Sequence, residues 1–424
     1  MINQTANSWR RWIEPWYFVY AVQGAIVAGL LPILLPLAAS HSGDTANIGL
    51  VMAAFSLGGL TAPFWGVLAD RFRLHRWLLC GGLLLGCGGL VLFSLTSQPG
   101  LWIVLAVLVG LGVAGAATVA NLFVVEVHPK SEWDERIGWL QTFYGVGQVV
   151  GLVLAGILSQ VDLRIGLLVG AGLTGFAALL GWLTTHTPPS ALAETPVLLH
   201  PARHSEGVSI SPQRLFHHLN STSIRNLASA VRSPFGVFLL MWLLAIGGSA
   251  AFFSQYPVLM QNVYGISPDV SSLAFAVVAG IGLVLYSPAG NWSDHFGAGK
   301  VMRAAQGIRL LAYLGLMGLV FVQSGFKDVL ALIGFGFVVC AWSLISVSGT
   351  SLAASLSPVG EGEGLGIYNA TNALAGVLGA ILGGWVAGTW GISFIPIVAV
   401  AGLILGVAIS FFLPGLKINK RSVS

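Results

Sequence analysis

The chain has 424 residues, of which 56% are hydrophobic and only 8% are charged, with a formal net charge of +4. Roughly a quarter of the residues are charged in an ordinary soluble domain, so these few charges cannot cover the surface of a soluble fold of this size. The composition therefore excludes a water-soluble protein and requires lipid as the outer solvent. The basic residues are scattered between apolar runs, which also argues against nucleic acid as a partner.

Apolar stretches of about 20 residues, each long enough to cross the hydrocarbon core of a bilayer as a helix, recur along the chain. The alternating pattern of a membrane β-barrel is missing from these stretches. The first run is too long for a signal-peptide core, so we expect it to be retained as a span. The predicted spans are 16–40, 47–69, 76–96, 101–125, 137–159, 165–186, 235–260, 269–291, 301–323, 328–352, 364–388 and 391–414. They predict an all-α membrane protein with twelve transmembrane helices.

One long polar break divides six spans from six. Residues 187–234 carry several prolines among His, Ser and Arg, and they predict a cytoplasmic linker between an N-terminal bundle, 1–186, and a C-terminal bundle, 235–424. Apolar residues within the linker recur at near-helical spacing, which predicts an amphipathic helix along the inner membrane surface. The linker histidines match no familiar spacing of metal ligands, so we predict neither a metal nor a cofactor.

The distribution of Lys and Arg predicts the orientation, because these residues resist translocation and collect in cytoplasmic loops. With the N-terminus inside, sixteen of the nineteen basic residues fall on the inner side and only Arg164 and Lys327 on the outer side. Both termini are then cytoplasmic, in an inner (plasma) membrane. Arg309 lies inside the ninth span, where its side chain could either snorkel to the surface or line a cavity.

The two halves share a repeated motif. After the second span, Gly66 to Arg76 reads Gly-x-x-x-Asp-basic-Phe followed by basic residues, and Gly290 to Lys300 repeats the pattern after the eighth span, so that Asp70 and Asp294 are 224 positions apart. Gly138 and Gly366 open the fifth and eleventh spans at an offset of 228. The same offset pairs Gly151 with Gly379. This repeat predicts two six-helix halves of parallel topology.

The segment from Gly66 to Arg76 resembles the loop signature of the major facilitator superfamily, which usually reads Gly-x-x-x-Asp-Arg-x-Gly-Arg-Arg. Arg73 stands where the signature has its second glycine. The resemblance, together with the layout of six plus six spans, covers essentially the whole chain. It implies two pseudo-symmetric six-helix bundles, transport of a small molecule by alternating access, and a monomer. We also predict no enzymatic activity, because no metal-ligand constellation, nucleophile–base grouping or phosphate-binding glycine loop lies at a membrane face.

The repeated loops predict a conformational latch at the inner mouth. Gly66 permits close helix contact there, and Asp70 supplies an anion that helix N-termini and basic side chains can hold. The resemblance implies that Asp70 engages the start of the eleventh span when the cavity opens outward, and that Asp294 engages the region of Arg136. The alternative is that these charges only fix topology. The predicted latch residues are Gly66, Asp70, Arg71, Arg76, Glu126, Arg136, Gly290, Asp294 and Lys300.

Polar and aromatic residues inside the spans are the candidates for substrate binding, since this fold holds its substrate between the halves near the midplane. Gln141, Tyr144 and Gln148 share one helical face, and the repeat places Asn369 and Asn372 on the matching face of the eleventh span. Each residue could equally bind a neighbouring helix. The full candidate set is Tyr20, Gln23, Gln141, Tyr144, Gln148, Phe253, Gln255, Tyr256, Trp342, Ser346, Asn369 and Asn372.

The coupling ion and the substrate are only partly constrained by the sequence. No Asp or Glu lies near the middle of a predicted span, so a deep proton relay has no obvious carrier. The run Gly147 to Gly156 resembles an antiporter signature, although Leu152 replaces its proline, and Ala106 stands where proton-drug antiporters carry an arginine. We predict a neutral or amphipathic organic solute, with efflux slightly favoured. The alternatives are a proton-coupled antiporter of drugs or metabolites, an anion transporter if Arg309 faces the cavity, and a sensor that does not transport.

Overall fold

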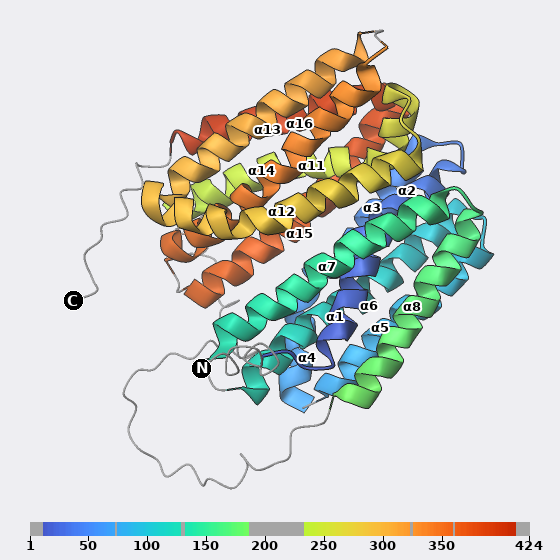
Figure 1. Cartoon of the computed structure of the whole chain (residues 1–424), viewed down its shortest axis with the longest axis vertical. Helices are drawn as coiled ribbons and strands as arrows, with labels where there is room; N and C mark the ends of the chain where they lie inside the picture. The colour runs from blue at the N-terminus through green and yellow to red at the C-terminus, as the bar shows by residue number, and fades with distance from the viewer. Residues whose placement is uncertain are drawn as a thin grey trace, which may run out of the picture.

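The computed structural model describes residues 12–72, 74–128, 132–185, 233–322, 325–358 and 361–412. Within these ranges every regular element is a helix, and the helices form two bundles that lie side by side (Figure 1). Residues 186–232, which include the predicted amphipathic helix, lie outside the described residues. The predicted all-α fold, with two six-helix bundles, is confirmed.

The first bundle contains six spans, two of which are interrupted. The first consists of α1 (Tyr17–Gly24), a π-helical turn η2 (Ala25–Leu30) and α2 (Leu31–Ser40), and the second is divided at Thr61 into α3 (Thr45–Leu60) and α4 (Ala62–Phe72). Pro63 lies in the first turn of α4, where the N–H that proline lacks would have no partner within the helix. The remaining spans are α5 (His75–Leu95), α6 (Pro99–Val127), α7 (Trp133–Ser159) and α8 (Leu163–Thr184).

The second bundle also contains six spans. They are α11 (Pro234–Tyr264), α12 (Pro268–Phe296), α13 (Ala298–Val320), α14 (Lys327–Leu356), α15 (Glu361–Thr389), and the short turn η5 (Ile392–Phe394) followed by α16 (Ile395–Ser410). Ten of the described helical spans are long and apolar enough to cross a membrane, and α3 is a shorter apolar helix. Helix α13 completes the set, although Lys300, Arg303 and Arg309 make it less apolar.

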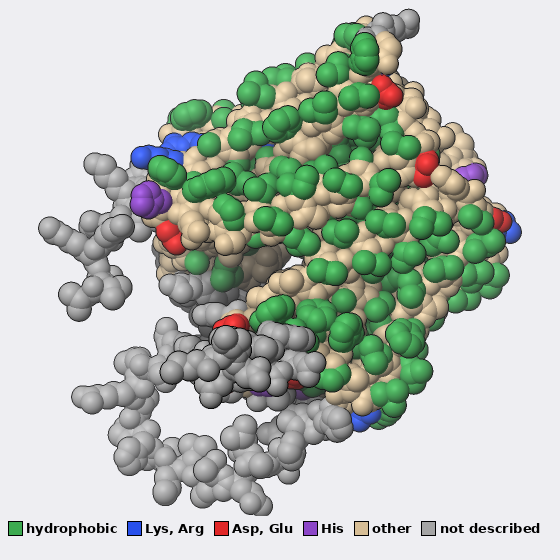
Figure 2. All heavy atoms as spheres, viewed as in Figure 1, with side chains coloured by type: hydrophobic (Ala, Val, Ile, Leu, Met, Phe, Trp, Pro, Cys, Tyr) green, Lys and Arg blue, Asp and Glu red, His purple; other side chains and the backbone are tan. Residues whose placement is uncertain are grey.

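Lipid is the natural solvent for the flanks of the molecule. Large apolar side chains such as those of Val284, Leu311 and Phe176 are exposed there, and hydrophobic side chains are spread over the visible face of both bundles (Figure 2). Exposed apolar surface on this scale would be unfavourable in water. The buried residues instead lie between helices within each bundle.

Glycines let the helix backbones touch within each bundle. A Cβ atom added at Gly151 of α7 would lie 2.0 Å from the carbonyl oxygen of Ala25 in the first span, and one at Gly379 of α15 would lie 2.2 Å from that of Gly247 in α11. Only glycine permits this approach, which is how helices associate where lipid removes the hydrophobic driving force. Because Gly151 and Gly379 are related by the internal repeat, the two bundles use the same packing device.

We call the face of the molecule where α1 begins and α16 ends the terminal face, and the face where α2 ends and α3 begins the opposite face. The bundles meet near the opposite face. Near the opposite face, a Cβ atom at Gly49 of α3 would lie 2.4 Å from Gly384 Cα of α15. Gln160 donates a hydrogen bond of 2.8 Å to Asp269, and Gln255 donates one of 3.3 Å to the carbonyl oxygen of Thr45. These contacts close the opposite face.

The bundles separate toward the terminal face. A Cβ atom added at Gly138 near the start of α7, or at Gly290 near the end of α12, would find no described atom of another segment within 4 Å. In Figure 1, α7 and α12 run close together at one end and diverge toward the other, and Figure 2 shows the surface hollowed between them. As far as the described residues show, the bundles are therefore open at the terminal face and closed at the opposite face.

Replacing Gly49 with leucine should favour the state that opens at the opposite face, because the new side chain cannot fit against the backbone of α15. Overpacking typically costs about 1 to 3 kcal/mol, which corresponds to roughly a tenfold shift in population. The measurement is labelling of Gln148→Cys by a membrane-impermeant maleimide applied from the opposite face, in a chain lacking its three native cysteines. Gly88→Leu is the control, since a Cβ atom there meets no neighbour within 4 Å among the described residues. Equal labelling of the two variants would contradict this account of closure.

Candidate functional site

A cavity of about 870 Å³ lies between the bundles. Its walls come from α7 of the first bundle and from α11, α12, α13, α14 and α15 of the second, with Ala28 at its edge. Along α7 the lining residues run from Gly138 to Gln148, and contacts with α12 run from Gly145, which packs on Leu283, to Gly156, which packs on Asp269. The cavity therefore lies on the terminal side of the contacts made by Gly49, Gln160 and Gln255 at the opposite face, which we call the seal. Its volume is in the range of small-molecule sites.

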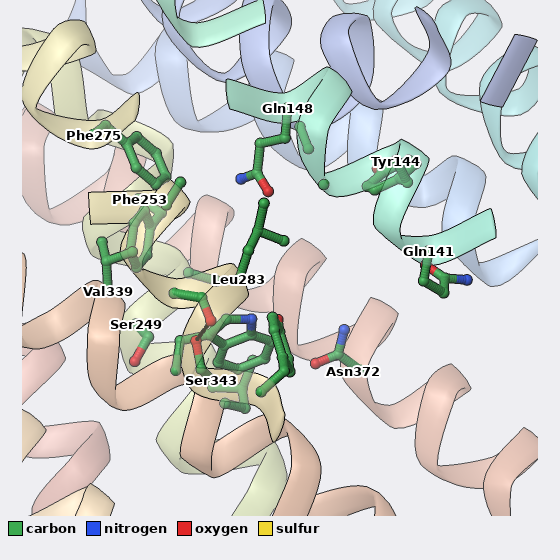
Figure 3. A pocket seen from close by; sticks show the side chains of 18 of the residues that line it. Gln141, Tyr144, Gln148, Ser249, Phe253, Phe275, Leu283, Val339, Ser343 and Asn372 are labelled. Atoms are coloured by element: carbon green, nitrogen blue, oxygen red, sulfur yellow. Dashed lines mark hydrogen bonds between the residues drawn. The ribbon is translucent and has the colours of Figure 1, made fainter. Parts of the chain in front are cut away.

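Helix α7 forms a polar wall of the cavity. Gln141, Tyr144 and Gln148 recur at i, i+3 and i+7 on the face that lines it, and Gln148 points from α7 toward Phe253 and Leu283 (Figure 3). The ring of Tyr144 packs against that of Tyr20, with centroids 5.0 Å apart. This contact supports the polar wall from behind.

The facing wall combines small polar groups with aromatic rings. Asn372 projects from α15 into the space between the bundles, and its side-chain oxygen accepts a hydrogen bond of 3.3 Å from Trp242 Nε1 (Figure 3). Ser343 donates to the carbonyl oxygen of Gly282 at 3.0 Å. The rings of Phe253 and Phe275 are 6.0 Å apart and form an apolar surface beside these groups. The cavity can thus take an apolar body and hydrogen-bond its polar groups.

Arg309 belongs to the same wall. It lies midway along α13, and only 2% of its surface is exposed. Its guanidinium carbon is 5.8 Å from the ring centroid of Phe253, 5.7 Å from that of Tyr313 and 5.6 Å from that of Trp342. Cation–π attraction from three rings offsets part of the cost of burying the charge. Among the two alternatives for Arg309, lining the cavity is therefore the one observed.

Half of the predicted substrate residues come together at this cavity. They are Gln141, Tyr144, Gln148, Phe253, Trp342 and Asn372. Their assignment to substrate binding stays a prediction. All six side chains line the same cavity, which opens toward the terminal face.

The other predicted substrate residues lie elsewhere. Gln23 donates to the carbonyl oxygen of Val113 at 2.6 Å, and Tyr256 donates to that of Ser271 at 2.8 Å, so both satisfy neighbouring helices. Gln255 takes part in the seal at the opposite face. The remaining three are Tyr20, which supports Tyr144, Ser346, which bonds its own helix, and Asn369, which is exposed outside the cavity wall.

Sequence reasoning missed several lining residues. On α12 the lining positions Phe275, Ala279, Gly282, Leu283 and Tyr286 follow helical spacing. That period could have marked one face of the eighth span, but apolar residues of a membrane helix give no sign of whether the face meets lipid or a cavity. Ser249 on α11 was a polar residue inside a span and was equally readable as a helix contact.

None of the ion pairs found among the described residues joins two of the predicted latch residues Arg76, Arg136, Asp294 and Lys300. Arg136 pairs with Glu14 and Glu132, both at 2.9 Å, and Arg76 donates to the carbonyl oxygen of Trp182 while its guanidinium stacks over that ring at 3.9 Å. A Cβ atom at Gly66 would meet only side chains of α6. Asp294 and Lys300 are exposed. The side chains of Asp70, Arg71 and Glu126 lie outside the described residues, so the latch stays a prediction.

Comparison with known proteins agrees with this architecture. A family model described as Major Facilitator Superfamily matches residues 16–353. The chain belongs to the major facilitator superfamily. Members of this superfamily and the similar proteins below are transporters, so this chain is a membrane transporter and not an enzyme.

Similar proteins span the chain to different extents. The multidrug resistance protein MdtG of Salmonella dublin is 24% identical over 419 residues, which cover 95% of this chain and 89% of that protein. The class C tetracycline resistance protein of Escherichia coli is 30% identical over 164 residues, but these cover only 38% of this chain and 40% of that protein. The crystal structure of the nucleoside transporter NupG superposes with a TM-score of 0.68 at 15% identity, covering 94% of this chain and 97% of that one. This last likeness supports the fold alone.

Cysteine substitutions along α7 should separate the cavity face from the lipid face. We expect Gln141→Cys, Tyr144→Cys and Gln148→Cys to react with a water-soluble maleimide from the terminal face, because these positions line the open cavity. Val146→Cys and Val150→Cys are matched controls on the same helix, half exposed but outside the cavity. Their thiols would face lipid and should react much more slowly. Similar rates at all five positions would show that this face of α7 is not the wall of an aqueous cavity.

Proposed function

We propose that this transporter moves a small organic solute, neutral or amphipathic, across the inner membrane by alternating access, and that it works as an exporter. The observation that carries the proposal is a cavity between two bundles that is open at one face and sealed by helix contacts at the other. A site reachable from one side at a time is what alternating access requires. Its walls combine amides with aromatic rings, which suits a solute with both apolar and polar parts.

The charge distribution supports a cytoplasmic terminal face. Arg76, Arg136 and Lys300 stand at helix ends on this face, whereas Arg164 and Lys327 stand at helix ends on the opposite face. Basic residues are retained preferentially on the cytoplasmic side of a membrane. The cavity of this state would then load from the cytoplasm, with both chain termini on that side.

The relatives support export of an amphipathic solute. Two of them carry names that describe resistance to drugs, and one of these matches nearly the whole chain. The antiporter-like run Gly147 to Gly156 of α7 does not by itself indicate antiport, because helix packing explains its glycines. Gly147 and Gly151 contact the backbone of the first span at Ala21 and Ala25, so they have a packing role that needs no coupled ion.

A proton-coupled multidrug antiporter is the second candidate, because the drug-resistance names of the same relatives fit a drug substrate without deciding how its transport is driven. Among the described residues that line the cavity there is no Asp or Glu. Protonation of a cavity carboxylate is the usual way to link a proton to a substrate site, so coupling here would need groups nearer the membrane surface. The proposal treats the protein as a monomer that needs only its solute and the bilayer.

Flux into proteoliposomes tests both candidates. We expect a broad panel of amphipathic compounds to include some that cross without a pH gradient, and Tyr144→Ala or Gln148→Ala to raise the KM for those compounds about 5- to 10-fold, as expected for the loss of one hydrogen bond or ring contact. Val150→Ala, on the lipid face of the same helix, should leave KM unchanged. Flux that requires a pH gradient would favour the antiporter, and no flux of any compound would count against transport.

A further inference from the structure

Arg309 is the one charged side chain among the described residues that line the cavity. It is buried at the centre of a membrane-spanning helix, and none of the ion pairs found among the described residues includes it. An ionised group at such depth is unfavourable unless it is paired, and such groups are rare within membrane spans. The charge therefore calls for a partner that the described residues do not supply.

The hydrogen-bonding state of the guanidinium points the same way. Its Nε and Nη1 atoms are buried and have no hydrogen-bond acceptor among the described residues. The three rings around the guanidinium attract its charge, but ring faces do not satisfy N–H donors directed elsewhere. An oxyanion is the acceptor that a guanidinium binds most strongly, through charge-assisted hydrogen bonds.

We propose that Arg309 binds the negatively charged group of the transported solute, which is therefore an amphipathic organic anion carrying a carboxylate or sulfonate. This inference rests on the proposed transport function and narrows its substrate class. The single positive charge of the cavity wall matches a single negative charge on the solute. The amides of Gln148 and Asn372 remain for its neutral polar groups.

The aromatic neighbours explain why the anion must have an apolar body. Arg309 is covered on nearly all sides, and the rings of Phe253 and Trp342 belong both to its cover and to the cavity wall. An entering anion reaches the guanidinium only when one of these rings turns aside. An apolar body replaces the contacts that the displaced ring loses, whereas a strongly hydrated inorganic anion such as phosphate cannot.

Matched ligands of different charge test this assignment on the purified full chain. The probes are 4-phenylbutyrate, its neutral amide 4-phenylbutyramide and the amine 4-phenylbutylamine, together with naphthalene-2-sulfonate and its sulfonamide. We expect at least one anion to bind at least ~10-fold more tightly than its neutral counterpart, since a charge-assisted hydrogen bond contributes more than a neutral one. Dissociation constants follow from the ligand dependence of Tm.

Variants of α13 separate a binding role from a structural one. In Arg309→Gln the preference for the anion should disappear, and in Arg309→Lys part of it should remain because the charge is kept. Arg303→Gln is the matched control, since Arg303 lies nearer the terminal end of α13, outside the cavity wall, and donates to the carbonyl oxygen of Gly299. The empty Arg309→Gln protein should have a Tm at least equal to that of the wild type, because the variant removes a buried unpaired charge.

Three results of the binding and unfolding measurements would overturn the assignment. One is that no anion binds more tightly than its neutral counterpart to the wild type, the second is that the preference persists in Arg309→Gln, and the third is that the empty variant unfolds at a clearly lower Tm, which marks a structural arginine. Flux of neutral compounds alone would sink this inference while leaving the transport proposal intact. An absence of flux for every compound, with selective anion binding still present, would instead defeat transport and leave the binding site standing.

Discussion

Close backbone contact at glycine is the interaction on which the rest of this structure depends. In lipid, apolar side chains gain little by leaving the solvent, so helix association relies on how closely backbones can approach. The pairs Gly151 with Ala25 and Gly379 with Gly247 hold helices together inside each bundle, and they are equivalent under the internal repeat. Gly49 with Gly384 makes the same kind of contact between bundles. Two tightly packed bodies that contact each other mainly through α3 with α15 and α7 with α12 can rock against each other, which is the motion that transport requires.

Helix α7 connects the packing of the first bundle to the cavity, because one of its faces packs against the first span and another lines the cavity. Gly147 and Gly151 fix it to the first span, while Tyr144 and Gln148 line the cavity and Gln160 reaches across to Asp269 in the seal. Helix α15 has a similar division, with Gly379 against α11, Gly384 against α3 and Asn372 at the cavity. A movement that opens the seal therefore displaces residues that would contact the solute. Substrate binding and opening are mechanically connected through the same two rigid helices.

The fold could be predicted from the sequence far better than the site. Lengths of apolar runs determine spans, and the repeat at Asp70 and Asp294 determines two halves, because both follow from the bilayer and from chain symmetry. The face of α7 was also predictable, since three polar residues shared it. Gln23 and Gln255 show what could not be predicted, because each is a polar residue in an apolar span, and each bonds a carbonyl oxygen of another helix. Only the packing of neighbouring helices distinguishes such a residue from a cavity residue.

That distinction rests on whether the protein itself satisfies each buried polar group. Ser343 donates to Gly282 and Tyr256 to Ser271, so these side chains gain nothing further from a ligand. Gln23 and Gln255 each keep one buried side-chain oxygen without a partner among the described residues. Arg309 differs from them because it is charged, two of its donors find no acceptor there, and it lines the cavity. An unsatisfied buried polar group costs about 1 to 3 kcal/mol, and more when it is charged. In a membrane span, water cannot relieve that cost from the lipid side. The Arg309 guanidinium therefore favours the binding of a solute that brings a negative charge into the cavity. The buried charge of Arg309, one of three basic residues that make α13 less apolar, is thereby the feature that most narrows the chemistry of the solute.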